Sequence, residues 1–135
     1  MDIESALRFA TENHHAILAT RRKDGAPQMS PVAVATMGDR IVISSRETAV
    51  KTKNLLRDPR ASLCLLNDGF FGAWAQVEGT AEVVHLPEAM DGLVEYYRQI
   101  SGEHPDWDEY RNAMERDQRV LLRITPERAG PNVSG

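Results

Sequence analysis

The sequence contains very little cysteine and no recognisable metal motif. Cys64 is the only cysteine among 135 residues, which excludes an internal disulfide and a zinc site built on several cysteines. Because Cys64 lies in the apolar run ASLCLL, we interpret it as a core residue rather than a nucleophile. The four histidines do not have the spacing of a metal-ligand motif. We therefore predict no metal site.

Long hydrophobic runs and an excess of positive charge are also missing. No apolar run approaches the about 20 residues of a membrane-spanning helix, so we predict no membrane segment. Asp2 and Glu4 stand where a secretory leader would carry positive charge, and this favours a cytoplasmic protein. The formal net charge is −4, which argues against general nucleic-acid binding. The GxSxG, GxGxxG and Walker patterns are absent as well.

The chain has the length and composition of one globular domain. Its hydrophobic residues make up 41% and its charged residues 27%, as in ordinary folded proteins. No internal repeat, low-complexity tract or linker divides it. We therefore expect a single domain over residues 1–135, because two cores would each be thin at this length.

The hydrophobic pattern predicts a mainly β protein with flanking helices. Short apolar strands follow one another with turn residues between them, and Gly79 in the longest strand suggests a bulge or bend. Such a meander closes more naturally into a barrel than into a sandwich. The run at 61–66 is continuously apolar, so we expect it to be buried on both faces. The expected strands are 15–22, 28–37, 40–45, 61–66, 71–85 and 118–124, and the expected helices are 4–13, 46–57, 88–100 and 101–117.

The helix expected at 46–57 gathers cations in an acidic chain. Ser44 and Glu47 have the spacing of a capping box, and the helix should end before Pro59. In one interpretation Glu47 pairs with Lys51 and the other cations are a solvated face. In the other, the helix start after Ser44 and Ser45 binds an anion, which a nearby lysine reinforces. The residue pattern leaves both open.

Five blocks of the sequence carry a resemblance to a known family. They are ILATRRKDGAPQMSPV, VKTKNLLRDPRASLCL, AQVEGTAEVV, YYRQISGEHPDWDEYRNAM and RVLLRI, and they cover most of the chain from Ala16 to Ile124. In order and spacing the chain resembles the pyridoxamine 5′-phosphate oxidase-like split barrels, and in particular the actinobacterial flavin/deazaflavin oxidoreductases that use coenzyme F420. The resemblance implies a six-stranded antiparallel split β-barrel (the FMN-binding split barrel). It also implies a homodimer with cofactor sites at its interface.

The resemblance also implies where the cofactor binds. The end of the third strand and the basic residues after it would hold the cofactor phosphate, with Lys51 in the position of the family's phosphate lysine. The strand containing PQMSPV would run along the tricyclic ring. The chain departs from many relatives at Ala49 and Val50, where an arginine often precedes the lysine, so Arg46 or Lys53 could take over its contact. The candidate cofactor residues are Gln28, Met29, Ser30, Pro31, Ser44, Ser45, Lys51, Lys53 and Asn54.

Two further regions are candidates for ligand contact. Arg21, Arg22 and Lys23 form a basic run that would favour the polyglutamate tail of a deazaflavin, although such runs are usually solvated. Trp74 is either a core residue or a wall of the substrate pocket. Trp107 and Tyr110 are expected to pack against the barrel.

The resemblance implies an oxidoreductase that transfers hydride between reduced coenzyme F420 and a small organic acceptor. The cofactor would supply the chemistry, and no catalytic acid or base is assigned beyond Ser30 as a possible proton donor. One alternative is an FMN-dependent oxidase or reductase of the same fold. Another is a non-catalytic flavin-binding or deazaflavin-binding protein. A third is a haem-handling relative, for which His85 or His104 would have to be the axial ligand.

Overall fold

The computed structural model describes residues 1–131 and contains four helices and seven strands within them. None of these helices has both the length and the apolar character needed to cross a membrane. The helices are α1 (Ile3–Glu12), α2 (Val50–Arg57), α3 (Met90–Ser101) and α4 (Trp107–Arg116). The strands are β1 (His15–Arg21), β2 (Pro27–Ala33), β3 (Ala35–Met37), β4 (Arg40–Arg46), β5 (Arg60–Leu66), β6 (Trp74–Val84) and β7 (Arg119–Gly130).

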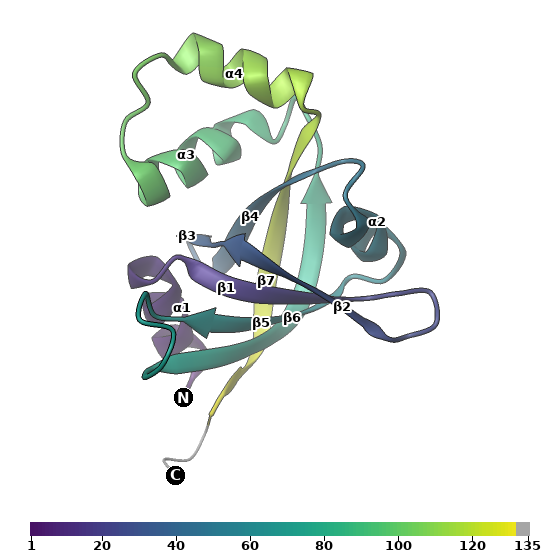
Figure 1. Ribbon diagram of the computed structural model, residues 1–135, viewed down its shortest axis with the longest axis vertical. Helices are drawn as coiled ribbons and strands as arrows, with labels where there is room; N and C mark the ends of the chain where they lie inside the picture. The colour runs from purple at the N-terminus through teal and green to yellow at the C-terminus, as the bar shows by residue number, and fades with distance from the viewer. Residues whose placement is uncertain (132–135) are drawn as a thin grey trace.

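The strands form one curled antiparallel sheet in the order β2-β1-β5-β6-β7-β4-β3 (Figure 1). The two edge strands, β2 and β3, are separated in sequence only by Val34, so the sheet has to curl until its edges meet. The buried Val34 donates its backbone N–H to the carbonyl of His14 at 2.8 Å and interrupts the strand expected at 28–37. The predicted split barrel is confirmed, with seven strands instead of six.

The barrel is split along one line. Strand β2 pairs with β1, and β4 pairs with β3 and β7, yet β2 and β4 approach each other closely. We call the line along which β2 (Pro27–Ala33) faces β4 (Arg40–Arg46) the seam. Strand β2 is an edge strand, and β4 pairs with β3 only over Arg40–Val42. Both strands therefore have unpaired backbone groups at the seam, where side chains or a ligand can join them.

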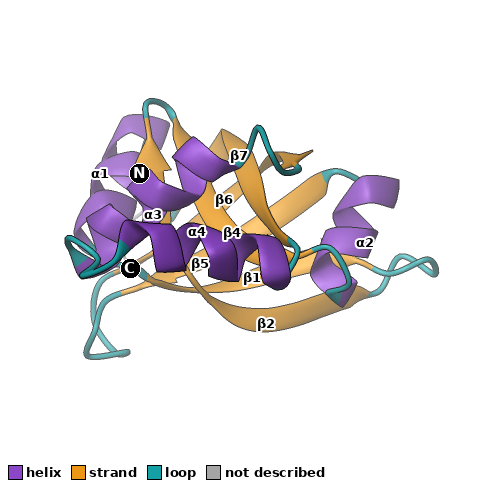
Figure 2. Ribbon diagram, turned by 90° about the horizontal axis from the view of Figure 1, so that it is seen from above, coloured by secondary structure: helices purple, strands orange, loops and turns teal. Residues whose placement is uncertain are grey.

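The inside of the curled sheet holds the main core. Its largest members, such as Leu18, Ile43 and Leu63, come from alternate positions of the strands, as a sheet with one buried face requires. Helices α1 and α2 lie at opposite ends of the barrel (Figure 2), where Ala6 of α1 and Leu55 of α2 join the core. The small side chains of α1 let it approach the sheet closely, and its N-cap Asp2 accepts a hydrogen bond from the Ser5 N–H.

A second core lies between the outer side of β4 and β7 and the α3–α4 hairpin. Val42 and Leu121 supply the sheet side, and Leu93 and Tyr110 supply the helix side. The Tyr110 hydroxyl donates to the Leu93 carbonyl at 2.7 Å and joins the two helices. The expected packing of Tyr110 and Trp107 against the barrel is therefore confirmed, and Asp106 caps the start of α4.

The structure corrects the expected start of the basic helix. Helix α2 begins at Val50 rather than Arg46, because β4 continues to Arg46 in register with Arg119 of β7. Its N-cap, Ala49, makes no side-chain capping bond, and the predicted Ser44–Glu47 capping box is not formed. Pairing to a long strand therefore outweighs the local capping signal.

Two strand predictions also change, and one is confirmed. Strand β5 alternates between buried and half-buried residues, with Cys64 half-buried on the outer side, so the expected burial of both faces and of Cys64 is wrong. Strand β7 runs on to Gly130, six residues beyond the predicted end at Ile124, because it pairs with β6 over that length. The bend predicted at Gly79 is confirmed, since the β6–β7 register shifts between Glu78 and Gly79.

Candidate functional site

The side chain of Lys51 reaches from α2 across the seam to β2. Its Nζ donates to Ser30 Oγ at 3.3 Å, and the contact is partly buried. Within residues 1–131, Lys51 has no carboxylate at ion-pair distance. An ammonium has three donors, so two of them remain beyond the contact with Ser30. The structure thus brings together two predicted site residues that are 21 positions apart.

The two serines at the end of β4 face opposite sides of the sheet. Ser45 faces the inside, is 2% exposed, and accepts a hydrogen bond from Thr52 Oγ1 at 2.9 Å. This contact ties the first turn of α2 to β4. Ser44 is half-buried on the outer side. Of the two predicted serines, Ser44 is therefore the one with surface left for a ligand.

The neighbouring motif residues Lys53 and Asn54 also differ. Asn54 is buried, donates to Thr20 Oγ1 at 3.1 Å, and accepts from Arg57 at 2.9 Å. These bonds fix α2 against β1. Lys53 is exposed on the solvent side of the helix. The geometry therefore places Lys51 at the seam, whereas Asn54 is occupied by hydrogen bonds to other protein side chains.

The ring-side candidates on β2 alternate between the two faces of the strand. Ser30 pairs with Leu18 and Gln28 with Thr20, and both partners are buried, so Ser30 and Gln28 face inward. The other two, Met29 and Pro31, face outward, and Met29 is 64% exposed. The backbone of β2 lies between these two sets of side chains and forms one side of the seam.

The other charged residues near α2 are engaged elsewhere. Glu47 faces His85, with its Oε1 3.1 Å from His85 Nδ1, so the interpretation in which Glu47 pairs with Lys51 is wrong. Arg57 donates to the Arg21 carbonyl at 2.7 Å. Arg46 lies on β4 and approaches Asp117 at 3.8 Å, which is an ion pair rather than a hydrogen bond. The cations expected on one helix at 46–57 are therefore divided between β4 and α2.

Tyr96 of α3 is a seam residue that sequence reasoning missed. Its hydroxyl donates to the Ala33 carbonyl at 2.9 Å, at the end of β2. Burial raises the pKa of Tyr96, while the Ser44 backbone N–H and the charge of Arg119 act in the opposite direction. Tyr96 is therefore a neutral donor that joins β2, β4 and α3. It opens the block YYRQISGEHPDWDEYRNAM, but its contact with Ala33, 63 positions away, could not be read from the sequence.

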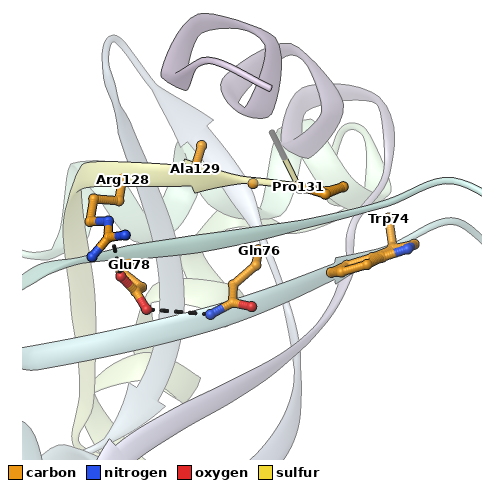
Figure 3. Close-up of a pocket in the computed structure, with 7 residues that line it drawn as sticks. Trp74, Gln76, Glu78, Arg128, Ala129 and Pro131 are labelled. Carbon is orange, nitrogen blue, oxygen red and sulfur yellow. Dashed lines mark hydrogen bonds and ion pairs between the residues drawn. The ribbon is translucent and has the colours of Figure 1, made fainter. Parts of the chain in front are cut away.

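Trp74 is 45% exposed and lines a hollow of about 340 Å³ on the outer side of β6 and β7 (Figure 3). Beside it, Gln76 Nε2 lies 3.4 Å from Glu78 Oε1, and Arg128 Nε lies 3.7 Å from Glu78 Oε2. Of the two roles left open for Trp74, the core role is excluded by this exposure. A flat indole on the outer side of the sheet is available to a ligand or a partner chain.

The chain matches one protein family and is similar to several solved structures. The model of the family described as pyridoxamine 5′-phosphate oxidase matches residues 3–131. Among solved structures, the conserved hypothetical protein Rv2991 from Mycobacterium tuberculosis is similar over 100% of this chain and 92% of its own, with 24% identity and a TM-score of 0.78. At this identity the likeness shows the fold.

Two further structures share the fold at lower identity. A structure named F420 reductase covers 87% of this chain and 89% of its own, with 20% identity and a TM-score of 0.67. A heme binding protein from Mycobacterium smegmatis covers 94% of this chain but 52% of its own, with 20% identity and a TM-score of 0.73. Structures with this fold therefore carry names that refer to different cofactors, and function has to be argued from the site.

Proposed function

Because this chain belongs to the pyridoxamine 5′-phosphate oxidase family, we propose that its seam binds coenzyme F420 and that the protein is an F420-dependent oxidoreductase. The observation that carries the proposal is Lys51, whose partly buried ammonium contacts Ser30 and faces no carboxylate within residues 1–131. A phosphate would supply the missing negative charge. Similarity to a structure named F420 reductase supports the choice of cofactor.

The residues of the seam fit a phosphate and a flat ring in different ways. Lys51 and Ser30 would hold the phosphate, with Ser44 as a further hydroxyl on the opposite strand. The backbone of β2 from Gln28 to Pro31 would line the ring. When bound, reduced coenzyme F420 supplies a hydride. The chain's own contribution is to hold the ring and exclude water from it.

The remaining predicted residues have other roles in our proposal, mainly in holding α2 in place. Ser45 and Asn54 are buried and hydrogen-bonded to Thr52 and Thr20, so we assign them the role of positioning α2. Arg46 lies at the end of β4 and is our candidate for the contact that Ala49 and Val50 cannot make. Because Ser30 is assigned to the phosphate beside Lys51, we no longer propose it as the proton donor to the acceptor and assign that role to no residue.

One basic run would reach a distant part of the ligand. Arg21, Arg22 and Lys23 are exposed at the β1–β2 turn, and we propose that they attract the polyglutamate tail. Replacing all three by alanine should weaken binding of F420 species with long tails more than those with short tails, measured by titration. Equal affinity for both tail lengths in this variant and the parent protein would overturn this contact.

We further propose that two copies pair through the outer side of β1, β2, β5 and β6. Met29 and Trp74 are large exposed apolar side chains there, and Ile17, Cys64 and Leu66 lie between them in register. Monomers rarely expose such a continuous apolar face. Sedimentation should show a dimer, and Trp74→Glu should shift it toward the monomer. A wild-type monomer at tens of micromolar would contradict the proposal.

The binding and turnover experiments that test this proposal also test three alternatives. FMN also has a phosphate and a flat ring, and a non-catalytic carrier would bind F420 without turnover. For haem, the two candidate ligands are engaged: His85 faces Glu47, and His104 accepts the Asp106 N–H and contacts three aromatic rings. Both histidines are engaged through Nδ1, which does not prevent Nε2 from binding an iron, so haem stays an alternative for the same titration. We expect the physiological compartment to be the cytoplasm.

The proposal is tested by fluorescence titration with coenzyme F420 and with FMN. We expect F420 to bind more tightly than FMN, and Lys51→Ala to weaken F420 by about 1–3 kcal/mol, because one charge-assisted contact is lost. Lys53→Ala removes the same charge two positions away from an exposed site and should change affinity little. Equal effects of both substitutions would mean that only net charge matters, and absence of F420 binding would overturn the proposal.

A further inference from the structure

The backbone groups of β2 point alternately toward β1 and toward the seam. Val34, the residue after β2, donates its N–H to the His14 carbonyl and so directs its own backbone groups toward β1. Neighbouring residues of a strand direct their N–H and C=O groups to opposite sides. The backbone groups of Ala33, Pro31 and Met29 therefore point toward β4. Strand β2 offers hydrogen-bonding groups to β4, yet no ladder joins the two strands within residues 1–131.

The pairing of β3 with β4 sets a register that β2 could follow. Ala35 of β3 lies opposite Val42 of β4, and extending this register by two residues would place Ala33 opposite Ser44. Among the described residues, β4 has no strand partner on this side beyond Val42. Antiparallel strands in register gain hydrogen bonds at alternate positions. The open seam therefore depends on features other than the register.

The hydroxyl of Tyr96 is one such feature. It donates to the Ala33 carbonyl at 2.9 Å, and the Ser44 backbone N–H is directed at the same oxygen. A hydroxyl can serve both groups because it donates and accepts. The hydroxyl thus stands between the two groups that would bond directly if the strands paired. Because the contact is partly buried, loss of the hydroxyl would favour a direct bond between Ala33 and Ser44 over two unpaired groups.

A second side chain of α3 holds the helix in place for this contact. Gln99 Oε1 accepts the Thr36 N–H at 2.7 Å, and Gln99 Nε2 donates to the Thr36 carbonyl at 2.9 Å. The amide thus bonds both backbone groups of a residue in the edge strand β3, as a neighbouring strand would. Tyr96 and Gln99 are three positions apart and lie on the same face of α3. Helix α3 therefore supplies hydrogen bonds that a strand would otherwise supply at this edge.

Pro31 limits pairing at the next position of β2 that faces β4. In the same register it would lie opposite Arg46, and a proline has no N–H to donate. Prolines occur on edge strands for this reason. Direct pairing of β2 with β4 would therefore begin at Ala33, where the Tyr96 hydroxyl stands.

We propose that Tyr96 is a positioning residue whose hydroxyl prevents β2 from pairing with β4 and so holds the seam open for the cofactor. The inference rests on the proposed function for the identity of the cofactor, whereas the spacing of the strands belongs to the cofactor-free protein. Only molecules with an open seam can bind, so the affinity falls in proportion to the fraction that is open. Loss of the hydroxyl should close the seam in most molecules.

The first measurement is NOE spectroscopy of the backbone amides in the cofactor-free protein, as wild type and as Tyr96→Phe. The substitution keeps the ring and removes only the oxygen, so the fold should be retained. In wild type the hydroxyl separates the amides of Ala33 and Ser44, and we expect no NOE between them. In Tyr96→Phe the strands should pair, and a new NOE should join these two amide protons.

The second measurement is fluorescence titration with F420. Tyr96→Phe should weaken F420 at least about fivefold, because the closed seam competes with the cofactor. Tyr110→Phe is the matched control, since it removes another buried hydroxyl of the α3–α4 hairpin, which donates to the Leu93 carbonyl at 2.7 Å. It should lower the stability of the hairpin but change F420 affinity less than about twofold, because its hydroxyl does not contact the seam.

The outcomes separate this inference from the proposed function. A new NOE between Ala33 and Ser44, together with weaker F420 binding in Tyr96→Phe but not in Tyr110→Phe, supports both. The new NOE without F420 binding to wild type supports the spacing role and overturns the F420-dependent function. Absence of the NOE in Tyr96→Phe, or its presence in wild type, overturns the inference alone. Unchanged F420 affinity in Tyr96→Phe, or equal weakening by both substitutions, also overturns it.

Discussion

The Nζ of Lys51 lies 3.3 Å from the hydroxyl oxygen of Ser30, so α2 and β2 meet across the seam through one polar contact. A neutral hydroxyl satisfies one donor of the ammonium but none of its charge. In our proposal this contact is a preformed anion site rather than a completed structural pair. The contact joins two separate sequence predictions: β2 as the strand beside the cofactor ring, and Lys51 as the residue that binds the cofactor phosphate.

Ser30→Ala should weaken F420 binding by about 0.5–1.5 kcal/mol, less than Lys51→Ala, because a neutral hydrogen bond is lost instead of a charged one. Isothermal titration calorimetry measures the difference directly. Ser101→Ala makes the same chemical change at an exposed position of α3 and should leave affinity unchanged. An unchanged affinity for Ser30→Ala would mean that the phosphate displaces Ser30 from Lys51.

Asn54→Ala should lower the free energy of unfolding by about 1–3 kcal/mol in the absence of any cofactor. The substitution removes a buried group that bonds to both Thr20 and Arg57, and it leaves their polar atoms without these partners. Urea unfolding followed by circular dichroism measures the loss. Lys53→Ala, one residue away and exposed, should change stability by less than about 0.5 kcal/mol. Equal stability of the two variants would refute the positioning role of Asn54.

Gly79→Ala should destabilise the fold by about 1–3 kcal/mol or more, since an added Cβ would lie 2.2 Å from the Thr125 carbonyl oxygen. The backbone cannot easily yield there, because the bulge brings β6 and β7 together. Thermal unfolding measures the effect. Gly69→Ala is the control, because its Cβ would meet neighbours at ordinary distances of 3.6 Å and above. A Gly79→Ala protein as stable as Gly69→Ala would show that the bulge can open without cost.

Alkaline pH should destabilise the α3–α4 hairpin through Tyr110. Burial raises the pKa of Tyr110 to about 12, above the ordinary value of about 10 in an unfolded chain. Between these values the unfolded chain releases the proton and the folded protein keeps it, so stability falls as pH rises from about 10 to 12. Below pH 10 this contribution is fully present.

The measurement is urea unfolding at several pH values for wild type and Tyr110→Phe. The variant should show a smaller loss of stability between pH 10 and 12, and the tyrosinate absorbance difference between the two proteins should titrate near pH 12. An identical pH slope in both proteins would contradict the role of Tyr110. The variant also loses the bond to the Leu93 carbonyl, so its stability should be lower at neutral pH too.

The sequence predicted the fold class, the bend at Gly79 and most strand centres, because alternating apolar residues and turn residues act locally. It failed at the start of α2, where pairing of Arg46 with Arg119 extends β4 through the expected cap. It also failed at the end of β7, whose polar residues follow the partner strand β6 rather than a hydrophobic pattern. In both places a strand distant in sequence decides the outcome.

The candidate site could also be predicted only in part: its residues could be named, but their burial could not. The motif around Lys51 and the strand containing Ser30 could be named separately, and the fold brings them together. Burial of Ser45 and Asn54 could not be read from the motif, because it depends on which face of β4 and α2 meets the barrel. The role of Tyr96 was missed for the same reason, because its hydroxyl bonds to Ala33, a partner that only the folded chain brings near.

The pairing of β4 with β7 also sets an order of events during synthesis. Ile41 and Ile43 of β4 pair with Ile124 and Leu122, which follow about eighty residues later. A ribosome releases these apolar β4 residues long before their partners exist, and such long-range pairing is slow to form and prone to aggregation. Until the last strand emerges, the nascent barrel cannot close, because β4 lacks the strand that it pairs with.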